Sequence, residues 1–381
     1  MKKDSGKAAE DRLREESREA APALFAENNI EAEVKGKHKK WLSLAVRYVL
    51  PLALTVALVW YMFRNVPFSQ VMQIIRKGAD YWWILLAMFI SIFSHVARAA
   101  RWRLQLRALG IEVPFMALCC SIFGCYALNL VFPRLGEVWR CTYVAKTGKA
   151  HFTTVLGSMV SDRLTDTISV LLLTVLTFIV ANSALRAFLE EYPVGQDILM
   201  LVENPFVWIA GVLTLFLIGC VFYFGRNTAV VKKLLIWLKE LWLGFATLWQ
   251  MKGRFKFALL TVAIWGCFFV QLYVAFFAFG FTRALCMEKN LAWGLVPCLV
   301  AFVLSSIGMA IPSNGGLGPW NIAVMFGLAI YGVSAEDGTA FSMLQWFGQT
   351  VMLIILGIYT MVYISLHRRH APYSLKQSTD N

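Results

Sequence analysis

Charged residues are scarce in this sequence, and long apolar runs dominate it. Only 15% of the 381 residues are charged, whereas 59% are hydrophobic and the mean hydropathy is +0.61. A soluble domain of this size is far less apolar, so the composition excludes that class. The alternating segments of about ten residues that a transmembrane barrel requires are also lacking. The sequence therefore predicts an all-α, polytopic integral membrane protein.

The common catalytic and metal-binding motifs are lacking as well. The sequence contains no HExxH, no GxSxG and no Walker A pattern, and its five histidines are scattered. Its eight cysteines form no CxxC pair and mostly fall in apolar runs, which favours small buried residues over disulfides or zinc ligands. We therefore expect a protein that is not an enzyme, does not hydrolyse ATP by itself, and uses no metal and no cofactor.

Positive charge is in excess, with a net charge of +13 spread over short loops. In a membrane protein, lysine and arginine in short loops mark the cytoplasmic side and attract anionic lipid headgroups. We therefore expect a membrane lipid as partner and no nucleic acid. The polar residues 1–40 end in the basic stretch KGKHKKW, which predicts a cytoplasmic N-terminal tail.

The remaining chain alternates between apolar runs and connecting segments of contrasting charge. The runs cover about 42–63, 81–100, 115–132, 152–181, 206–225, 257–281, 293–311, 320–333 and 339–366. The segment 182–205 is acidic and is predicted to be an external loop, whereas the basic residues after 366 predict a cytoplasmic tail at 367–381.

Two runs do not fit simple spans. Basic loops flank 115–132 on both sides, so both of its ends should be cytoplasmic, as in a hairpin that enters the membrane and returns. The run 320–333 would be about 21 Å long as a helix, which is too short for a bilayer core of about 30 Å. It pairs naturally with 293–311 as a second hairpin that enters from outside.

These assignments divide the chain into a first membrane half, 41–181, and a second half, 206–366. Each half has the order span, span, hairpin, span, in opposite orientation, which gives about six full spans plus two re-entrant hairpins, or eight spans if the hairpins cross. The stretches FPRLGEVW and IPSNGGLGPW, at 132–139 and 311–320, resemble each other. The sequence thus favours an inverted repeat, the architecture of many secondary transporters.

Charged residues interrupt the apolar run 152–181 at SDRLTD. Asp162 would lie about 15 Å from the start of a helix beginning at Phe152, near the bilayer midplane. Asp162 and Asp166 share a helix face, and Arg163 flanks it as an expected partner of Asp166. An Arg–Asp cluster that fixes helix packing is one interpretation. We favour a substrate or proton site, because apolar packing would hold helices without the cost of inserting charges.

A polar stripe also ends the run 81–100, where His95, Arg98 and Arg101 recur at three-residue spacing. For Arg101, Arg103 and Arg107 we expect cytoplasmic anchors that snorkel to the interface. Arg98 lies closer to the apolar core, so that both an anchor and a site residue remain open for it.

The two predicted hairpins contain helix-breaking residues. LVFPRLGEVWR has Pro133 and Gly136 before Glu137 and Arg140, and IPSNGGLGPWN cannot form a regular helix. Non-helical backbone at membrane depth requires protein or a water-filled cavity to satisfy it, and its free amides suit an anion such as phosphate. The candidate binding residues of the second break are Asn314, Gly315, Gly316 and Gly318.

In their order and spacing, RAARW, NLVFPRLGEVWR, SDRLTD and PSNGGLG resemble motifs of a known family. It is the flippase-like transmembrane family that includes the lysylphosphatidylglycerol synthase transmembrane region, the lipid-translocating half of the multiple peptide resistance factor. The resemblance covers about residues 42–366. It implies site roles for Glu137, Arg140, Arg163, Asp166, Gly315, Gly316 and Gly318. It also implies a stand-alone translocase without the aminoacyl-transferase domain.

Two positions depart from that family pattern. The family often has a glutamate shortly after the GGxG motif, where this chain has Asn321, and often an arginine in the last span, where this chain has Gln345 and Gln349. The second half is therefore expected to hold less charge, which leaves the lipid headgroup open.

The resemblance and the residues together imply a flippase or transporter of the bacterial inner membrane. It would move a phospholipid or polyprenyl-linked lipid through a charged cavity between the halves, with arginines neutralising the phosphate. Two alternatives remain: an integral-membrane lipid-linked transferase that uses Asp162 or Asp166 as a base, and a non-catalytic membrane partner of a lipid-modifying enzyme.

Overall fold

The computed structural model describes residues 68–132, 134–184 and 253–369, together with a few isolated residues in 53–60, 186 and 204–216. The first 52 residues lie outside the described part, as do 217–252 and 370–381. The predicted spans 42–63 and 206–225 therefore fall almost entirely outside it, as do the external loop 182–205, both predicted tails and Cys220. The helices named below belong to the compact unit that begins at Thr55.

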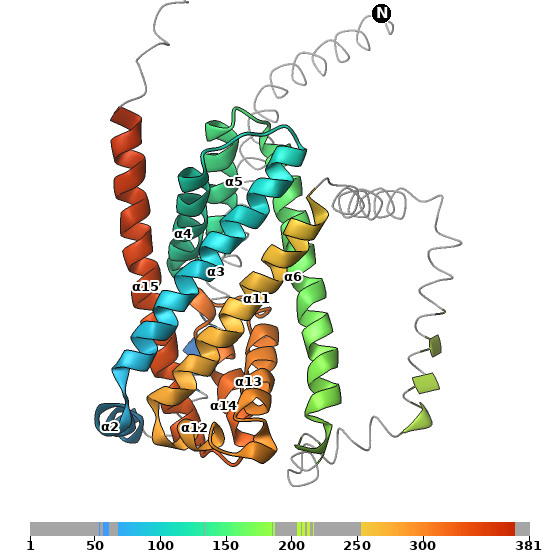
Figure 1. Cartoon of the computed structure of the whole chain (residues 1–381), viewed down its shortest axis with the longest axis vertical. Coiled ribbons are helices and arrows are strands. Elements are labelled where there is room, and N and C mark those ends of the chain that lie inside the picture. Colours follow the sequence, from blue (N-terminus) through green and yellow to red (C-terminus); the bar gives the residue numbers. More distant parts are fainter. Residues whose placement is uncertain are drawn as a thin grey trace, which may run out of the picture. The chain divides into compact units, whose positions relative to one another are not determined.

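Helices make up the secondary structure of the described residues, which confirms the all-α prediction (Figure 1). Four of them are long and apolar enough to cross a membrane: α3 (Tyr81–Ala108), α6 (Phe152–Val180), α11 (Arg254–Ala275) and α15 (Ala335–Arg369). They match four of the six predicted full spans. The short helix η1 (Phe276–Ala278) extends α11 directly.

Two pairs of shorter helices occupy the positions of the predicted hairpins. The first pair is α4 (Phe115–Val131) with α5 (Leu135–Thr147), and the second is α13 (Leu295–Gly308) with α14 (Pro319–Ala329). The helices of each pair pack on each other. In Figure 1, α4 and α5 lie at the upper end of the unit, and α13 and α14 at the lower end.

The breaks inside both pairs have a backbone cause. Arg134 precedes α5 in the left-handed region with φ 66°, and Pro133 lies just before it in the sequence. Between α13 and α14 the chain forms η3 (Asn314–Gly316), and the left-handed φ of 58° at Gly315 is a conformation that a residue without Cβ adopts easily. Pro319 then occupies the first turn of α14, where its missing N–H leaves no hydrogen bond unmade.

The remaining elements are short and lie at the lower end of Figure 1. They are α2 (Phe68–Gly78), α12 (Gly280–Leu285) and η2 (Lys289–Leu291). Helix α2 is strongly amphipathic and packs on α15.

The first half contains α3, α4, α5 and α6, and the second contains α11, α13, α14 and α15. Contacts made by helices of one half correspond to contacts made by the equivalent helices of the other. Helices α3 and α11 pack along each other, α4 contacts α15, and α13 contacts α6 in the corresponding way. The first helix of each short pair therefore contacts the last long helix of the other half, and the second helix contacts the last long helix of its own half.

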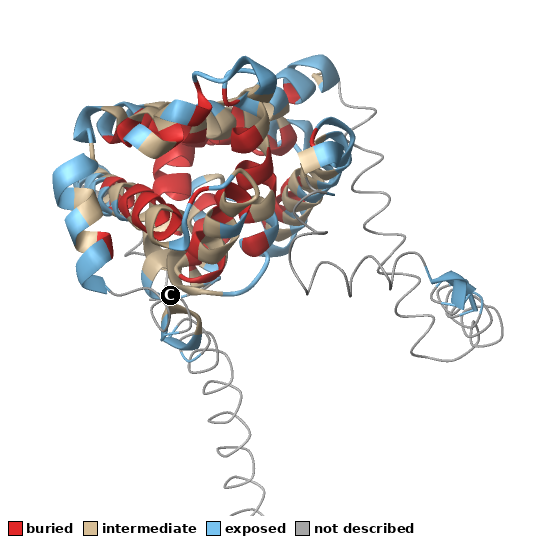
Figure 2. Ribbon diagram, turned by 90° about the horizontal axis from the view of Figure 1, so that it is seen from below, coloured by how far each residue is buried: buried red, intermediate tan, exposed pale blue. Residues whose placement is uncertain are grey.

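Among the described residues, two larger apolar cores follow this division except at the start of α3, and a small third cluster consists of Val71 and Ala340. One joins buried residues of α3, α4, α5 and α6, among them Trp102 and Ile122. The other joins the start of α3 to α11, α13, α14 and α15, with Phe276 and Phe341 at its centre. Figure 2 shows the buried residues on the faces that the helices turn toward one another.

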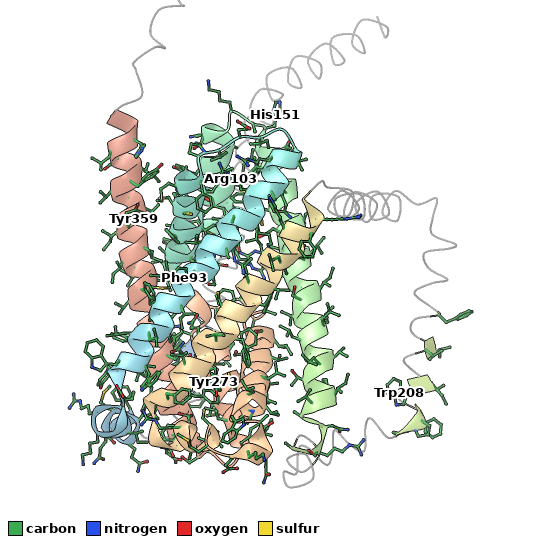
Figure 3. All side chains as sticks on the ribbon, viewed as in Figure 1. Phe93, Arg103, His151, Trp208, Tyr273 and Tyr359 are labelled. Carbon is green, nitrogen blue, oxygen red and sulfur yellow. The ribbon has the colours of Figure 1, made fainter. Side chains whose placement is uncertain are left out.

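Apolar side chains also cover the outside of the long helices. Phe93 on α3 and Tyr359 on α15, both labelled in Figure 3, belong to a large set of exposed aromatic and aliphatic residues. A soluble protein would expose patches of this size to water only at a strong cost. The exposed apolar surface agrees with a multi-pass membrane protein.

The cysteines follow the sequence-based prediction. Those that the structure describes are free, and all except the half-buried Cys267 are buried: Cys119, Cys120, Cys125, Cys141, Cys286 and Cys298.

Candidate functional site

Asp162 is the centre of a buried charged cluster. It lies on the inner face of α6 with an exposed fraction of 0%. Arg101 of α3 donates a hydrogen bond from Nε to Oδ1 of Asp162 at 2.9 Å, and its Nη2 lies 2.7 Å from the same oxygen. This contact of two guanidinium nitrogens with one carboxylate oxygen neutralises a charge that would otherwise be costly to bury.

Asp166 shares the same arginine. Nη2 of Arg101 lies 2.7 Å from Oδ1 of Asp166, while Arg98 donates a short hydrogen bond to its other oxygen. Arg101 also donates to Thr261 of α11 at 3.3 Å. The two carboxylates on one face of α6 therefore join α6 to α3, and the arginine extends the cluster to α11.

Arg140 completes the buried part from the first hairpin. It is fully buried on α5, its Nη2 lies 3.8 Å from Asp162, and its guanidinium lies over the ring of Trp102 at 4.4 Å. The indole N–H of Trp102 is itself held by Ser158 at 3.0 Å. Among the described residues, none accepts a hydrogen bond from the three guanidinium nitrogens of Arg140. A buried arginine with this many free donors has capacity for an anion.

Arg163 and Glu137 form the exposed edge of the cluster. Nη2 of Arg163 lies 3.2 Å from Oε1 of Glu137, and the two side chains are 36% and 22% exposed. Both border a hollow between α5 and α6, and the lining is completed by Met159, Val160, Leu164 and Thr167. The hollow thus opens beside the residues that lead inward to Arg140 and Asp162.

The charges of the cluster do not balance. Four arginines, Arg98, Arg101, Arg140 and Arg163, face three carboxylates, those of Glu137, Asp162 and Asp166. One positive charge is left in a low-dielectric surrounding, which favours binding of a further anion.

The tips of the two helix pairs meet. The Asn314 side chain of η3 donates to the carbonyl of Val131 at the end of α4 at 2.9 Å, and Gly315 lies directly against Leu130. The indole of Trp346 on α15 donates to the carbonyl of Gly315 at 2.9 Å. The ends of the two helix pairs are therefore in direct contact.

A protein-family model matches residues 48–357, most of the chain, and its description is the lysylphosphatidylglycerol synthase TM region. The chain belongs to this family. Comparison with curated proteins gives no match. Membership in the lysylphosphatidylglycerol synthase TM region family indicates a membrane function related to lipids, and it confirms the resemblance seen in RAARW, NLVFPRLGEVWR, SDRLTD and PSNGGLG.

In this family member, one sequence-based pairing and one sequence-based role were wrong. Asp166 is bound by Arg98 and Arg101 and not by its neighbour Arg163, because Arg163 points along α6 toward Glu137 of α5. Arg101 is no interfacial anchor: it is fully buried and is the arginine that holds both aspartates. The three-residue spacing of His95, Arg98 and Arg101 was the signal that could have placed all three on one inward face.

The hollow beside Arg163 does not include all of the predicted site residues. Gly136 lies so close to the Cys125 carbonyl of α4 that an added Cβ would be 2.0 Å from the oxygen. Gly136 and Gly316 are both absent from the lining of the Arg163 hollow, and Asp162 is too deeply buried to face it. Gly136, Gly315, Gly316 and Gly318 therefore shape the hairpin tips, while Arg163 and Glu137 border the hollow.

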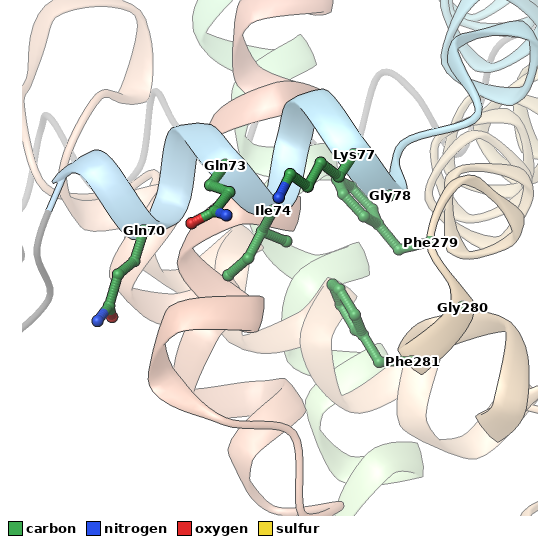
Figure 4. Close-up of a pocket in the computed structure, with 8 residues that line it drawn as sticks. All are labelled: Gln70, Gln73, Ile74, Lys77, Gly78, Phe279, Gly280 and Phe281. Carbon is green, nitrogen blue, oxygen red and sulfur yellow. The ribbon is translucent and has the colours of Figure 1, made fainter.

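A second hollow lies at the opposite end of the unit, beside α2 (Figure 4). Gln70, Gln73 and Lys77 line it on one side, and Phe279 and Phe281 on the other. Lys77 is the single charged residue in its lining, so this hollow is distinct from the charged cluster.

The part of the chain that the structure describes contains no group of histidine, cysteine, aspartate or glutamate side chains that could hold a metal ion.

Proposed function

We propose that this protein moves an anionic, phosphate-bearing lipid across the bacterial inner membrane. The main observation behind the proposal is the excess of positive charge in the cluster of α3, α5 and α6. The guanidinium of buried Arg140 has no hydrogen-bond acceptor there among the described residues. A lipid phosphate supplies charge and acceptor oxygens together, and arginine matches its geometry. The hollow beside Arg163 and Glu137 supplies a route to the cluster from the edge of the bundle.

In this proposal the carboxylates position arginines and take no part in bond cleavage. Asp162 and Asp166 each contact more than one arginine, so both carboxylates are engaged in ion pairs within the cluster. A transport role without catalysis therefore fits the geometry better than a transferase.

We further infer that α4 with α5 and α13 with α14 are re-entrant hairpins of an inverted repeat. The matched helix contacts, the placement of the two pairs at opposite ends and the meeting of their tips support this arrangement (Figure 1). Alternating access would then consist of movement of one half against the other around the charged cluster.

Lipid translocation in proteoliposomes tests the function. Purified protein is reconstituted with fluorescent phosphatidylglycerol, and dithionite quenching reports the fraction of lipid that reaches the outer leaflet. Arg140→Gln should slow translocation at least about tenfold, the loss that one charge-assisted phosphate contact of about 1.4 kcal/mol or more gives.

Arg283→Gln is the matched control. Arg283 is half-exposed and pairs with Asp80 outside the cluster. The Arg283→Gln protein should therefore translocate lipid at the rate of the unaltered protein. Equal rates for Arg140→Gln and Arg283→Gln would contradict a phosphate role for the cluster.

A further inference from the structure

The second half of the protein contains a buried polar group that the proposed function does not use. Oε1 of Gln349 on α15 accepts a hydrogen bond from the Gln271 amide of α11 at 2.8 Å and lies 3.2 Å from the hydroxyl of Ser91 on α3. Gln345, one turn earlier on α15, is almost completely buried. Three helices thus meet on neutral amide and hydroxyl groups in the middle of an apolar core.

The positions of these amides repeat those of the charged cluster. Gln345 and Gln349 have the four-residue spacing of Asp162 and Asp166, on the long helix that closes each half. Arg98 and Gln271, which bind the second member of each pair, both stand at the eighteenth position of their helices α3 and α11.

The contacts to the hairpins repeat in the same way. Arg163, directly after Asp162, binds Glu137 of the first hairpin, and Trp346, directly after Gln345, binds the Gly315 carbonyl of the second. Ser91 and Arg98 lie equally far from the middle of α3, on either side of it. The buried glutamines are therefore the uncharged counterpart of the charged cluster. They meet α3 about 10 Å closer to its N-terminus than the cluster does.

This counterpart has free hydrogen-bonding capacity. Within the described residues, no donor reaches Oε1 of Gln345 or Oε1 of Gln271, although both atoms are buried. An acceptor left buried without a donor destabilises a protein by about 1–3 kcal/mol. Helix packing alone does not require such a cost, since leucine or methionine would fill the same space.

We infer that Gln271, Gln345 and Gln349 form a second binding site, which takes the uncharged hydroxyl groups of a lipid headgroup. The amide oxygens accept from hydroxyl donors, and the missing charge leaves the phosphate to the arginine cluster. A headgroup with both phosphate and free hydroxyls would contact the two sites in succession as it crosses the middle of the bundle. This inference rests on the proposed lipid translocation.

Two lipids of equal charge can test the hydroxyl site, because both present the same phosphate charge to the charged cluster. Phosphatidylglycerol and phosphatidylethanol carry the same single phosphodiester charge, but only the glycerol headgroup has free hydroxyls. In proteoliposomes, the unaltered protein should move fluorescent phosphatidylglycerol about fivefold faster, the factor given by one net hydrogen bond of about 1 kcal/mol. Gln345→Met keeps the side-chain length and should abolish this preference, so that the variant moves both lipids at the same rate.

The outcomes distinguish the two ideas. If Gln345→Met slows both lipids equally, or if the unaltered protein does not discriminate, the hydroxyl site is wrong and the amides only join helices. If a folded, reconstituted protein moves neither lipid, the proposed function itself fails. Gln271→Met serves as the second variant where Gln345→Met does not insert, and it should remove the same preference.

Discussion

At the scale of single residues, the partner of each charge decides its importance. Arg101 binds two aspartates and is fully buried, whereas Arg163 binds one glutamate at the edge of a hollow. Removing one partner of a buried pair leaves an uncompensated charge in a low dielectric, while an exposed pair contributes little. The four arginines of the cluster are thus unequal in energy.

Arg101→Ala should therefore destabilise the protein by about 3–5 kcal/mol. It leaves Asp162 buried with only the more distant Arg98 and Arg140, at 4.0 and 3.8 Å. Arg163→Ala, in contrast, should cost less than about 1 kcal/mol. Thermal unfolding of both variants in detergent measures the difference, and a larger loss for Arg163→Ala would contradict the assignment of partners.

At the same scale, Arg163 should matter more for activity than for stability. Arg163→Ala is expected to leave the protein folded but to slow lipid translocation, because Arg163 borders the route to the cluster. The translocation rate of the variant, normalised to the amount of reconstituted protein, checks this. An unaltered rate would remove Arg163 from the route.

At the scale of helices, close backbone approach holds the first hairpin together. Gly136 sits against the Cys125 carbonyl, and its amide N–H donates to the Asn129 side chain at 2.9 Å. Asn129 thereby supplies an acceptor to the start of α5, where backbone amides have no helical partner. The geometry leaves no space for a side chain at this glycine.

Gly136→Ala should therefore separate α4 from α5 and destabilise the protein by about 1–3 kcal/mol. Gly266→Ala in α11 is the control, because an added Cβ there meets nothing within 4 Å. Alanine favours a helix over glycine, so the control should be neutral or stabilising. Melting temperatures in detergent compare the two, and equal values would show that the hairpin can open.

At the scale of the whole molecule, an inverted repeat requires the two hairpins to enter from opposite sides. Lys146 lies near the end of α5, and Lys289 lies in η2, which joins α12 to α13; both are exposed. In Figure 1, α5 lies at the upper end of the unit, and α12 and α13 at the lower end. In a variant without native cysteines, Lys146→Cys should react with an impermeant thiol reagent only from the cytoplasmic side, and Lys289→Cys only from outside. Reaction of both from one side would contradict the repeat.

Much of the fold can be predicted from the sequence alone. The four long helices appear as apolar runs, since hydropathy and length are local properties, and the breaks near 133 and 312–319 follow from proline and glycine. Asp162, Arg163 and Asp166 were found because a charge inside an apolar run is visible without any neighbour. Family membership follows from the sequence as well, because the spacing of its motifs is a property of the chain.

The tertiary structure alone decided which charges meet. Arg101 looked like the end of a span, but α6 and α11 pack against it, and it holds both aspartates of the cluster. Likewise, the sequence marked Gln345 and Gln349 only as departures from the family pattern. The packing of α3, α11 and α15 is what brings Gln349 into hydrogen bonds with Gln271 and Ser91. Partners far apart in the chain are set by which helix faces pack together. A sequence fixes the face on which a residue lies, but the packing of other helices determines what that face meets.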